Sequence, residues 1–185
     1  MSYVYKRQGD ITIMHITKSD IITIIIICIL MICTLFVIKP TIVRGESMTP
    51  TLQDGSYLIL NKLAYCRHEP EYGDVIVVRS DYDGGELLIK RVIGVAGDEI
   101  RIDAHDVYRN GQRLDETYTN ADLEEYEPEE QQTWVVPEDA LFVLGDHRSV
   151  SADSRRRDVG FISCDDIVGK AVLRLFPFDE IGRLE

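Results

Sequence analysis

The hydrophobic and polar positions divide the chain into one long apolar run and a series of much shorter ones. Residues 21–38 read IITIIIICILMICTLFVI, which is 18 residues without a charged side chain. At about 1.5 Å per residue, a helix of this length spans nearly the whole hydrocarbon thickness of a bilayer. We therefore predict a transmembrane anchor at residues 21–39, preceded by a short N-terminal segment of residues 1–20.

A cleaved signal peptide is the alternative interpretation of this run. The apolar core exceeds the usual signal-peptide length of about 7–15 residues, and no cleavage site of the Ala-x-Ala type follows it. The first alanine of the chain is Ala64. Lys6, Arg7 and Lys18 precede the run and favour a cytoplasmic N-terminus with the following domain outside, although Lys39 weakens the contrast.

The remaining residues, 40–185, are predicted to form an antiparallel β domain. Aliphatic and β-branched runs bounded by Gly and Asp are typical of strands. They lie at residues 57–60, 75–78, 87–95, 134–136, 141–144 and 168–176. Between Val107 and Leu114, an Asn-Gly pair indicates a hairpin. No long helical period appears here, so the predicted fold class is mainly β.

The charge of the chain narrows its expected partners. The formal net charge is −12, and residues 115–132 carry eight acidic and no basic residues. We interpret this segment as a solvated loop, with contact to a basic partner as the alternative. Nucleic acid is not an expected partner, because binding it requires a basic face. Acidity is compatible with a soluble domain held beside membrane lipid.

Cysteine and histidine spacing predicts no metal and no cofactor. The sequence contains no Cys-x-x-Cys, no His-Glu-x-x-His and no phosphate-binding Gly-rich loop, and its four histidines are scattered singly. Cys66 and Cys164 lie in the β domain. The sequence is compatible with a disulfide between these two cysteines and also with two free thiols.

One serine and one lysine are candidates for chemistry. Ser47 lies in the run GESMTPTL, where Pro50 opposes a helix, so we expect a turn leading into a strand. Lys90 lies inside the strand predicted at residues 87–95. A serine hydroxyl needs a neighbouring base, and lysine serves as one only when burial lowers its pKa. The alternatives are a surface serine and an exposed lysine on an edge strand.

A dense polar segment, residues 145–155, follows the strand predicted at residues 141–144 and reads GDHRSVSADSR. Its hydroxyls and opposite charges suit a loop that orients a lysine amine. A surface turn with ordinary ion pairs is the alternative.

Four segments in order resemble the bacterial type I signal peptidases, membrane-bound Ser/Lys endopeptidases that remove signal peptides from exported preproteins. They are Gly45–Leu52, Gly73–Val78, Lys90–Gly94 with Gly97-Asp98, and Gly145–Arg155. One such segment is a weak signal, whereas four in order behind an apolar run are specific. The single predicted anchor resembles the compact form typical of Gram-positive bacteria.

The resemblance implies a role for each matching residue. Ser47 would be the nucleophile, with its backbone N–H as one oxyanion donor, and Lys90 would be the general base. Ser151 would hydrogen-bond the lysine amine. Asp153 and Arg155 would form an ion pair within the polar loop, with Arg148 as a partner. Shallow pockets for small substrate side chains would be lined by Met48, Leu52, Leu88 and Ile89.

Two positions depart from the family pattern. Gly45 stands where some members carry a serine whose hydroxyl completes the oxyanion hole. The sequence therefore does not identify the second hydrogen-bond donor to the oxyanion. His147 stands where Asn is usual, and either a tolerated replacement or an altered pH behaviour is expected.

The resemblance implies a cell-membrane enzyme with its catalytic domain outside the cytoplasm, acting on signal peptides. A peptidase of the same class dedicated to one exported substrate, such as a pilin, is the nearest alternative. A self-cleaving repressor-type Ser/Lys protease is disfavoured by the anchor and by the lack of a helix-turn-helix region. A membrane-tethered β domain that binds peptides without cutting is disfavoured because both Ser47 and Lys90 are present.

Overall fold

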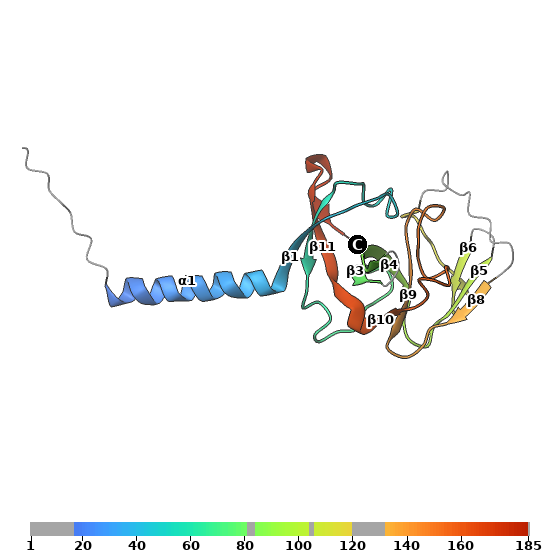
Figure 1. The fold of residues 1–185 in the computed structure, drawn as a ribbon, viewed down its shortest axis with the longest axis horizontal. Helices are drawn as coiled ribbons and strands as arrows, with labels where there is room; N and C mark the ends of the chain where they lie inside the picture. Colours follow the sequence, from blue (N-terminus) through green and yellow to red (C-terminus); the bar gives the residue numbers. More distant parts are fainter. Residues whose placement is uncertain (1–16, 81–83, 104–105, 120–131, 185) are drawn as a thin grey trace, which may run out of the picture. The chain divides into compact units, whose positions relative to one another are not determined.

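The computed structural model describes residues 17–80, 84–103, 106–119 and 132–184 (Figure 1). The chain divides into two units, residues 1–35 and residues 36–185. The predicted N-terminal segment, residues 1–20, and the predicted acidic loop, residues 115–132, lie mostly outside the described residues.

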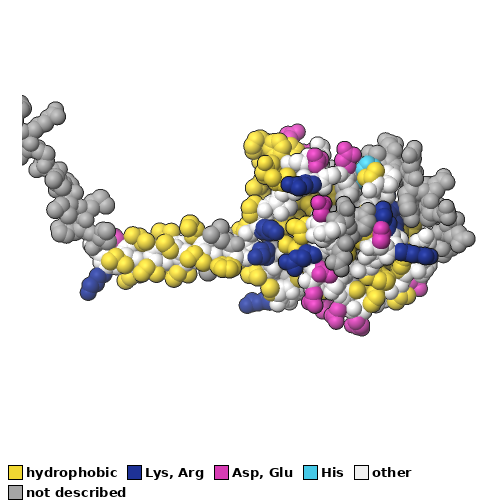
Figure 2. Space-filling model, in the orientation of Figure 1, with side chains coloured by type: hydrophobic (Ala, Val, Ile, Leu, Met, Phe, Trp, Pro, Cys, Tyr) yellow, Lys and Arg dark blue, Asp and Glu magenta, His cyan; other side chains and the backbone are white. Residues whose placement is uncertain are grey.

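Helix α1 (Lys18–Val37) begins after the capping residue Thr17. The backbone N–H and the hydroxyl of Thr17 donate to Oδ2 of Asp20, and the backbone N–H of Asp20 donates to Oγ1 of Thr17. Its large apolar side chains are exposed, and they coat the helix in the space-filling view (Figure 2). No helix in the described part of the chain meets the length and hydropathy needed to cross a membrane. The anchor predicted at residues 21–39 stays a prediction.

An antiparallel sheet of eight strands forms the main body of the second unit (Figure 1). In spatial order it contains β1 (Ile38–Ile42), β2 (Tyr57–Asn61), β11 (Ile167–Phe176), β3 (Val75–Arg79), β4 (Leu87–Gly94), β9 (Ala140–Leu144) and β10 (Ile162–Ser163), with β12 (Gly182–Arg183) paired to β11. The predicted strands at residues 57–60, 75–78, 87–95, 141–144 and 168–176 are confirmed. Short 3-10 turns at Cys164–Asp166 and Phe178–Glu180 flank β11.

A second antiparallel sheet has four strands in the order β7 (Gln112–Arg113), β6 (Asp106–Arg109), β5 (Glu99–Asp103) and β8 (Gln132–Val135). The predicted Asn-Gly hairpin joins β6 to β7, and both turn residues have the positive φ that this turn requires, 53° at Asn110 and 77° at Gly111. The prediction of a mainly β antiparallel fold is confirmed.

Strand β4 occupies the interior of the large sheet. It pairs with β3, where Ile76 faces Lys90, and with β9, where Leu144 faces Arg91. Lys90 and Arg91 are each only 2% exposed. The alternative of exposed basic residues on an edge strand is therefore wrong, and two adjacent buried cations need partners on opposite faces of the strand.

Candidate active site

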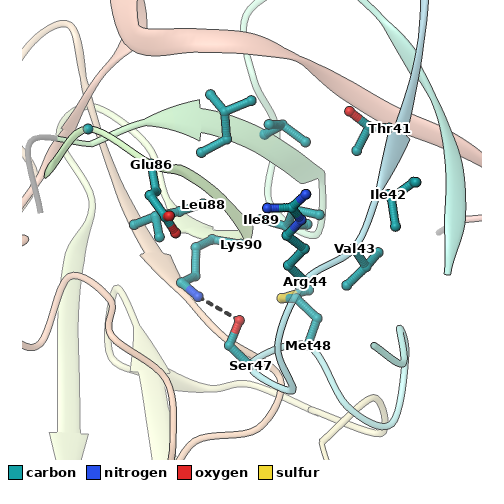
Figure 3. A pocket seen from close by; sticks show the side chains of 13 residues that line it. Thr41, Ile42, Val43, Arg44, Ser47, Met48, Glu86, Leu88, Ile89 and Lys90 are labelled. Atoms are coloured by element: carbon teal, nitrogen blue, oxygen red, sulfur yellow. Dashed lines mark hydrogen bonds between the residues drawn. The ribbon is translucent and has the colours of Figure 1, made fainter. Parts of the chain in front are cut away.

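Ser47 and Lys90 meet although 43 residues separate them in sequence. The Nζ atom of Lys90 donates a hydrogen bond to Oγ of Ser47 at 2.8 Å (Figure 3). Ser47 lies in the turn between β1 and β2, as expected, and Lys90 projects from the middle of β4. The fold therefore brings together a hydroxyl and the amine that could take its proton.

Burial lowers the pKa of Lys90 from 10.5 to about 8. The carboxylates of Asp153 and Asp146 oppose this shift because they favour the charged amine, and the Arg155 guanidinium adds to it. A lysine with this pKa is neutral in a substantial fraction of molecules at slightly alkaline pH. Its amine can then accept a proton.

A cleft with a volume of about 460 Å³ opens beside this pair (Figure 3). Residues from the end of β1 and from β4 form its walls. They are Thr41–Arg44, Ser47, Met48, Val77 and Gly85–Lys90. A smaller hollow of about 370 Å³ shares Arg44, Ser47, Leu88 and Lys90 and is completed by the polar loop at Val150 and Ala152.

The predicted pocket residues divide into two groups. Met48, Leu88 and Ile89 line the cleft. Leu52 is not among the residues that line the cleft: it is fully buried in the core cluster with Leu58 and Leu60. Leu52 lies at the end of the turn, with its backbone N–H bonded to the carbonyl of Met48, and its side chain packs inward.

Two charged residues of the cleft were missed in the sequence. Arg44 and Glu86 both line it, and both are labelled in Figure 3. Arg44 follows β1 and Glu86 precedes β4. In the sequence, both look like ordinary surface charges, so no pattern distinguished them.

The polar loop, residues 145–155, packs directly against the turn that carries Ser47. A Cβ atom added at Gly145 would lie closer than 3.0 Å to the carbonyl oxygen of Ser47 and to Oγ of Ser151. The backbone N–H of His147 donates to the Ser47 carbonyl at 3.1 Å, and its ring Nδ1 lies 3.2 Å from the carbonyl oxygen of Glu46. Only a glycine at position 145 permits this approach.

Ser151 lies in the expected place without the expected contact. Its Oγ is buried and, among the described residues, has no hydrogen-bond partner. The amine of Lys90 donates to Ser47 instead. The hydrogen bond predicted between Ser151 and Lys90 is therefore not formed in this structure, in which the Ser151 hydroxyl packs against Gly145.

The predicted ion pair between Asp153 and Arg155 is present. Arg155 donates from Nε to Oδ1 of Asp153 at 2.8 Å and from Nη2 to Oδ2 at 2.9 Å, and both side chains are buried. Asp153 Oδ2 also accepts from the Gly145 N–H at 3.0 Å, which closes the loop on itself.

Arg148, predicted as a partner of that pair, bonds elsewhere. Its guanidinium donates twice to Glu116, a residue of the acidic segment. Its backbone carbonyl accepts a hydrogen bond from Arg155, and its guanidinium feels the charge of Asp153. Glu116 was missed because the acidic segment was interpreted as solvated.

The backbone N–H of Gly45 donates to Oδ1 of Asp54 at 2.8 Å. Gly45 has a φ of 83°, which only glycine adopts readily, so this turn favours glycine over serine at position 45.

The described residues contain no group of three or more His, Cys, Asp or Glu that could hold a metal ion. Cys66 and Cys164 are both free thiols in the structure.

Comparisons with known proteins identify the family of this chain. Residues 15–176 fit the family described as signal peptidase, peptidase S26. The probable signal peptidase I-1 of Synechocystis is 36% identical over 80% of this chain and 76% of its own. Signal peptidase IB of Staphylococcus aureus is 35% identical over 78% of this chain and 81% of its own length.

A solved structure of a signal peptidase I from Enterococcus faecalis V583 is 30% identical, covers 55% of this chain and 96% of its own, and has a TM-score of 0.47. The family match extends over most of the chain, from α1 to the end of β11, and includes the Ser47 turn, Lys90 and the polar loop. This chain therefore belongs to the signal peptidase family, peptidase S26.

Proposed function

We propose that this protein is a membrane-bound serine endopeptidase that removes N-terminal signal peptides from exported preproteins. The observation that carries the proposal is the 2.8 Å hydrogen bond between a serine hydroxyl and a buried lysine whose pKa is lowered to about 8. Family membership and the named relatives support the substrate class.

In this mechanism, Lys90 acts in its neutral form. Its lone pair takes the proton of the Ser47 hydroxyl while Oγ attacks the carbonyl carbon before the cut. The protonated amine then gives that proton to the leaving nitrogen, and an acyl-enzyme remains. Neutral Lys90 next takes a proton from water, the hydroxide attacks the ester, and Ser47 is released with its proton restored.

The cleft favours an extended peptide with small side chains. It is bounded by the end of β1 on one side and by β4 on the other, so a peptide strand can add between them. Met48, Leu88 and Ile89 give it apolar walls, and these suit short side chains at alternate positions before the cut.

We further propose that residues 21–39 anchor the enzyme in the cell membrane with the catalytic domain outside the cytoplasm. The support is the run of 18 residues without a charge and the basic residues that precede it. Extraction of cell membranes with alkaline carbonate tests the anchor, which predicts retention in the pellet. Release of the full chain into the supernatant would contradict it.

The function is tested by incubating the full chain, in detergent, with a preprotein that carries an Ala-x-Ala site. The wild type should cleave it, while Ser47→Ala and Lys90→Ala should not. Lys90→Arg should also fail, because arginine stays protonated near neutral pH. Full activity in any of the three variants would overturn the residue assignment.

A panel of several unrelated preproteins then separates a general enzyme from a dedicated one. Cleavage of most of the panel supports a general signal peptidase, and cleavage of a single precursor supports a peptidase dedicated to one exported substrate.

A further inference from the structure

His147 contacts two successive carbonyl groups of the turn that carries the nucleophile. Its ring Nδ1 lies 3.2 Å from the carbonyl oxygen of Glu46, and its backbone N–H donates to the carbonyl of Ser47 at 3.1 Å. The residue is buried, with 8% exposed. One residue of the polar loop thus holds the backbone of the turn at both ends of the Ser47 residue.

The chemistry of the Glu46 carbonyl decides which ring nitrogen carries hydrogen. A carbonyl oxygen only accepts, so Nδ1 must be the protonated nitrogen of a neutral His147 ring. The same oxygen accepts the N–H of Thr49 at 3.0 Å. Both lone pairs of this carbonyl are therefore occupied, which fixes its direction from two sides.

The carbonyl of Glu46 and the N–H of Ser47 belong to the same peptide group. That peptide is trans, since the cis bonds in the described residues are Thr49–Pro50 and Phe176–Pro177. In a planar trans peptide, the C=O and N–H bonds point in opposite directions, so donors that fix the oxygen also fix the N–H. Hydrogen bonds to the oxygen also polarise the amide and strengthen its N–H as a donor.

The backbone N–H of Ser47 is available to donate a hydrogen bond to a substrate. In the part of the chain that the structure describes, it donates no hydrogen bond, and Ser47 lines both hollows beside the base. Gly45 offers no hydroxyl, and its own N–H is occupied by Asp54. Stabilisation of the oxyanion in this chain therefore depends strongly on the direction and strength of the Ser47 N–H.

We propose that His147 is a positioning residue that orients and polarises the Glu46–Ser47 peptide, so that the Ser47 N–H stabilises the oxyanion. This inference rests on the proposed function. It joins two features of this turn: Gly45 offers no hydroxyl, and the carbonyl of Glu46 lies against the imidazole of His147. His147 does not touch the substrate, and its effect passes through one backbone peptide.

Two variants separate hydrogen-bond donation from packing. His147→Asn keeps a side-chain N–H donor, and His147→Phe keeps a ring of similar size without one. His68→Ala is the matched control, because His68 is exposed and lines a separate hollow with Tyr65 and Lys170. Each full-length variant is assayed in detergent for kcat and KM on the preprotein, for inhibition by a peptide aldehyde of the cleavage-site sequence, and for thermal unfolding.

His147→Phe should lower kcat by about 10- to 100-fold with little change in KM, because the lost interaction acts in the transition state. The aldehyde forms a tetrahedral adduct with Ser47, so its affinity should fall in parallel with kcat/KM. His147→Asn should recover most of kcat, and His68→Ala should match the wild type. Equal losses in the Phe and Asn variants, or a Phe variant with wild-type kcat, would overturn the inference.

A measurement on the unaltered protein does not depend on any variant folding. In the ¹⁵N spectrum of the wild-type enzyme at alkaline pH, His147 should carry its proton on Nδ1. A bare Nδ1 would overturn the inference even if the Phe variant were unstable. Failure of the wild type to cleave any preprotein would instead refute the proposed function, and the ¹⁵N spectrum would still decide the contact with Glu46.

Discussion

Glu116 and Arg148 form a two-point ion pair that ties the start of the acidic segment to the loop beside Ser47. The two guanidinium nitrogens donate at 3.0 and 2.5 Å, and both side chains are largely buried. Tyr118 extends the contact: its hydroxyl donates to Glu116 at 2.8 Å, and its ring covers the guanidinium of Arg91 at 4.0 Å. Residues 116–118 thus belong to the support of the active site.

Replacement of Glu116 by Gln should therefore destabilise the fold. It leaves the buried cation of Arg148 without its counterion, and breaking a buried pair in this way costs about 3 kcal/mol of unfolding free energy. Urea denaturation at neutral pH measures the change. The matched control is Asp158→Asn, which removes the acid of an exposed pair with Arg156 and should leave stability nearly unchanged. Equal effects in the two variants would show that Arg148 does not depend on Glu116.

Cleavage should increase with pH across the titration of Lys90. The amine must be neutral to act as a base, and its pKa is lowered to about 8, so kcat/KM should rise from pH 6 and level off above that value. The pH profile of the wild type on a soluble preprotein measures it. A profile still rising steeply near pH 10 would indicate a lysine with an ordinary pKa.

The same pKa predicts that Lys90 weakens the fold at neutral pH. Its pKa is 10.5 in the unfolded chain and about 8 in the folded one, so the unfolded chain binds more protons between these values. The cost, on the order of 3 kcal/mol, is fully present below pH 8 and disappears as pH rises through 10.5.

Lys90→Met removes the charge at similar length and should be more stable than the wild type at pH 7. The difference should shrink when both proteins are denatured at higher pH. A constant difference at pH 7 and at pH 10 would show that packing, and not protonation, causes it.

Gly145→Ala should lower kcat by roughly 100-fold or more. The added methyl group would overlap the Ser47 carbonyl, which is backbone and cannot turn away as a side chain does. The turn must therefore move relative to Lys90, and a displacement of about 1 Å can cost roughly 100-fold in rate. Gly182→Ala is the control, since the nearest atom to its new methyl lies at 4.0 Å. Wild-type kcat in Gly145→Ala would mean that the turn and loop separate without consequence.

Much of the fold was predictable because its central strands are aliphatic. The strands near residues 75–78 and 141–144 lie inside the large sheet, and their residues are buried on both faces. Strands β1 and β5 were missed for the opposite reason. Strand β1 is partly exposed and contains Pro40, and β5 alternates charged and apolar residues over only five positions.

The site was predictable where two rare features coincided, and not where a side chain's direction mattered. A lysine inside an apolar strand and a serine in a proline-containing turn made Lys90 and Ser47 candidates, and the resemblance supplied their roles. Leu52 shares the apolar character of Met48, but the turn directs it into the core. The partnership of Glu116 with Arg148 spans 32 residues, and an acidic run contains no local signal of it.

The interior position of β4 means that, in the proposed mechanism, the base at Lys90 forms only when the large sheet is complete. Ser47 comes from the turn between the first two strands, Lys90 from the strand paired to β9, and the clamping loop from the residues after β9. Until these segments assemble, the lysine is hydrated, protonated and unable to accept a proton. In the proposed mechanism, burial in the assembled sheet is what lets the Lys90 amine accept a proton, so a chain that has not yet folded would lack its base.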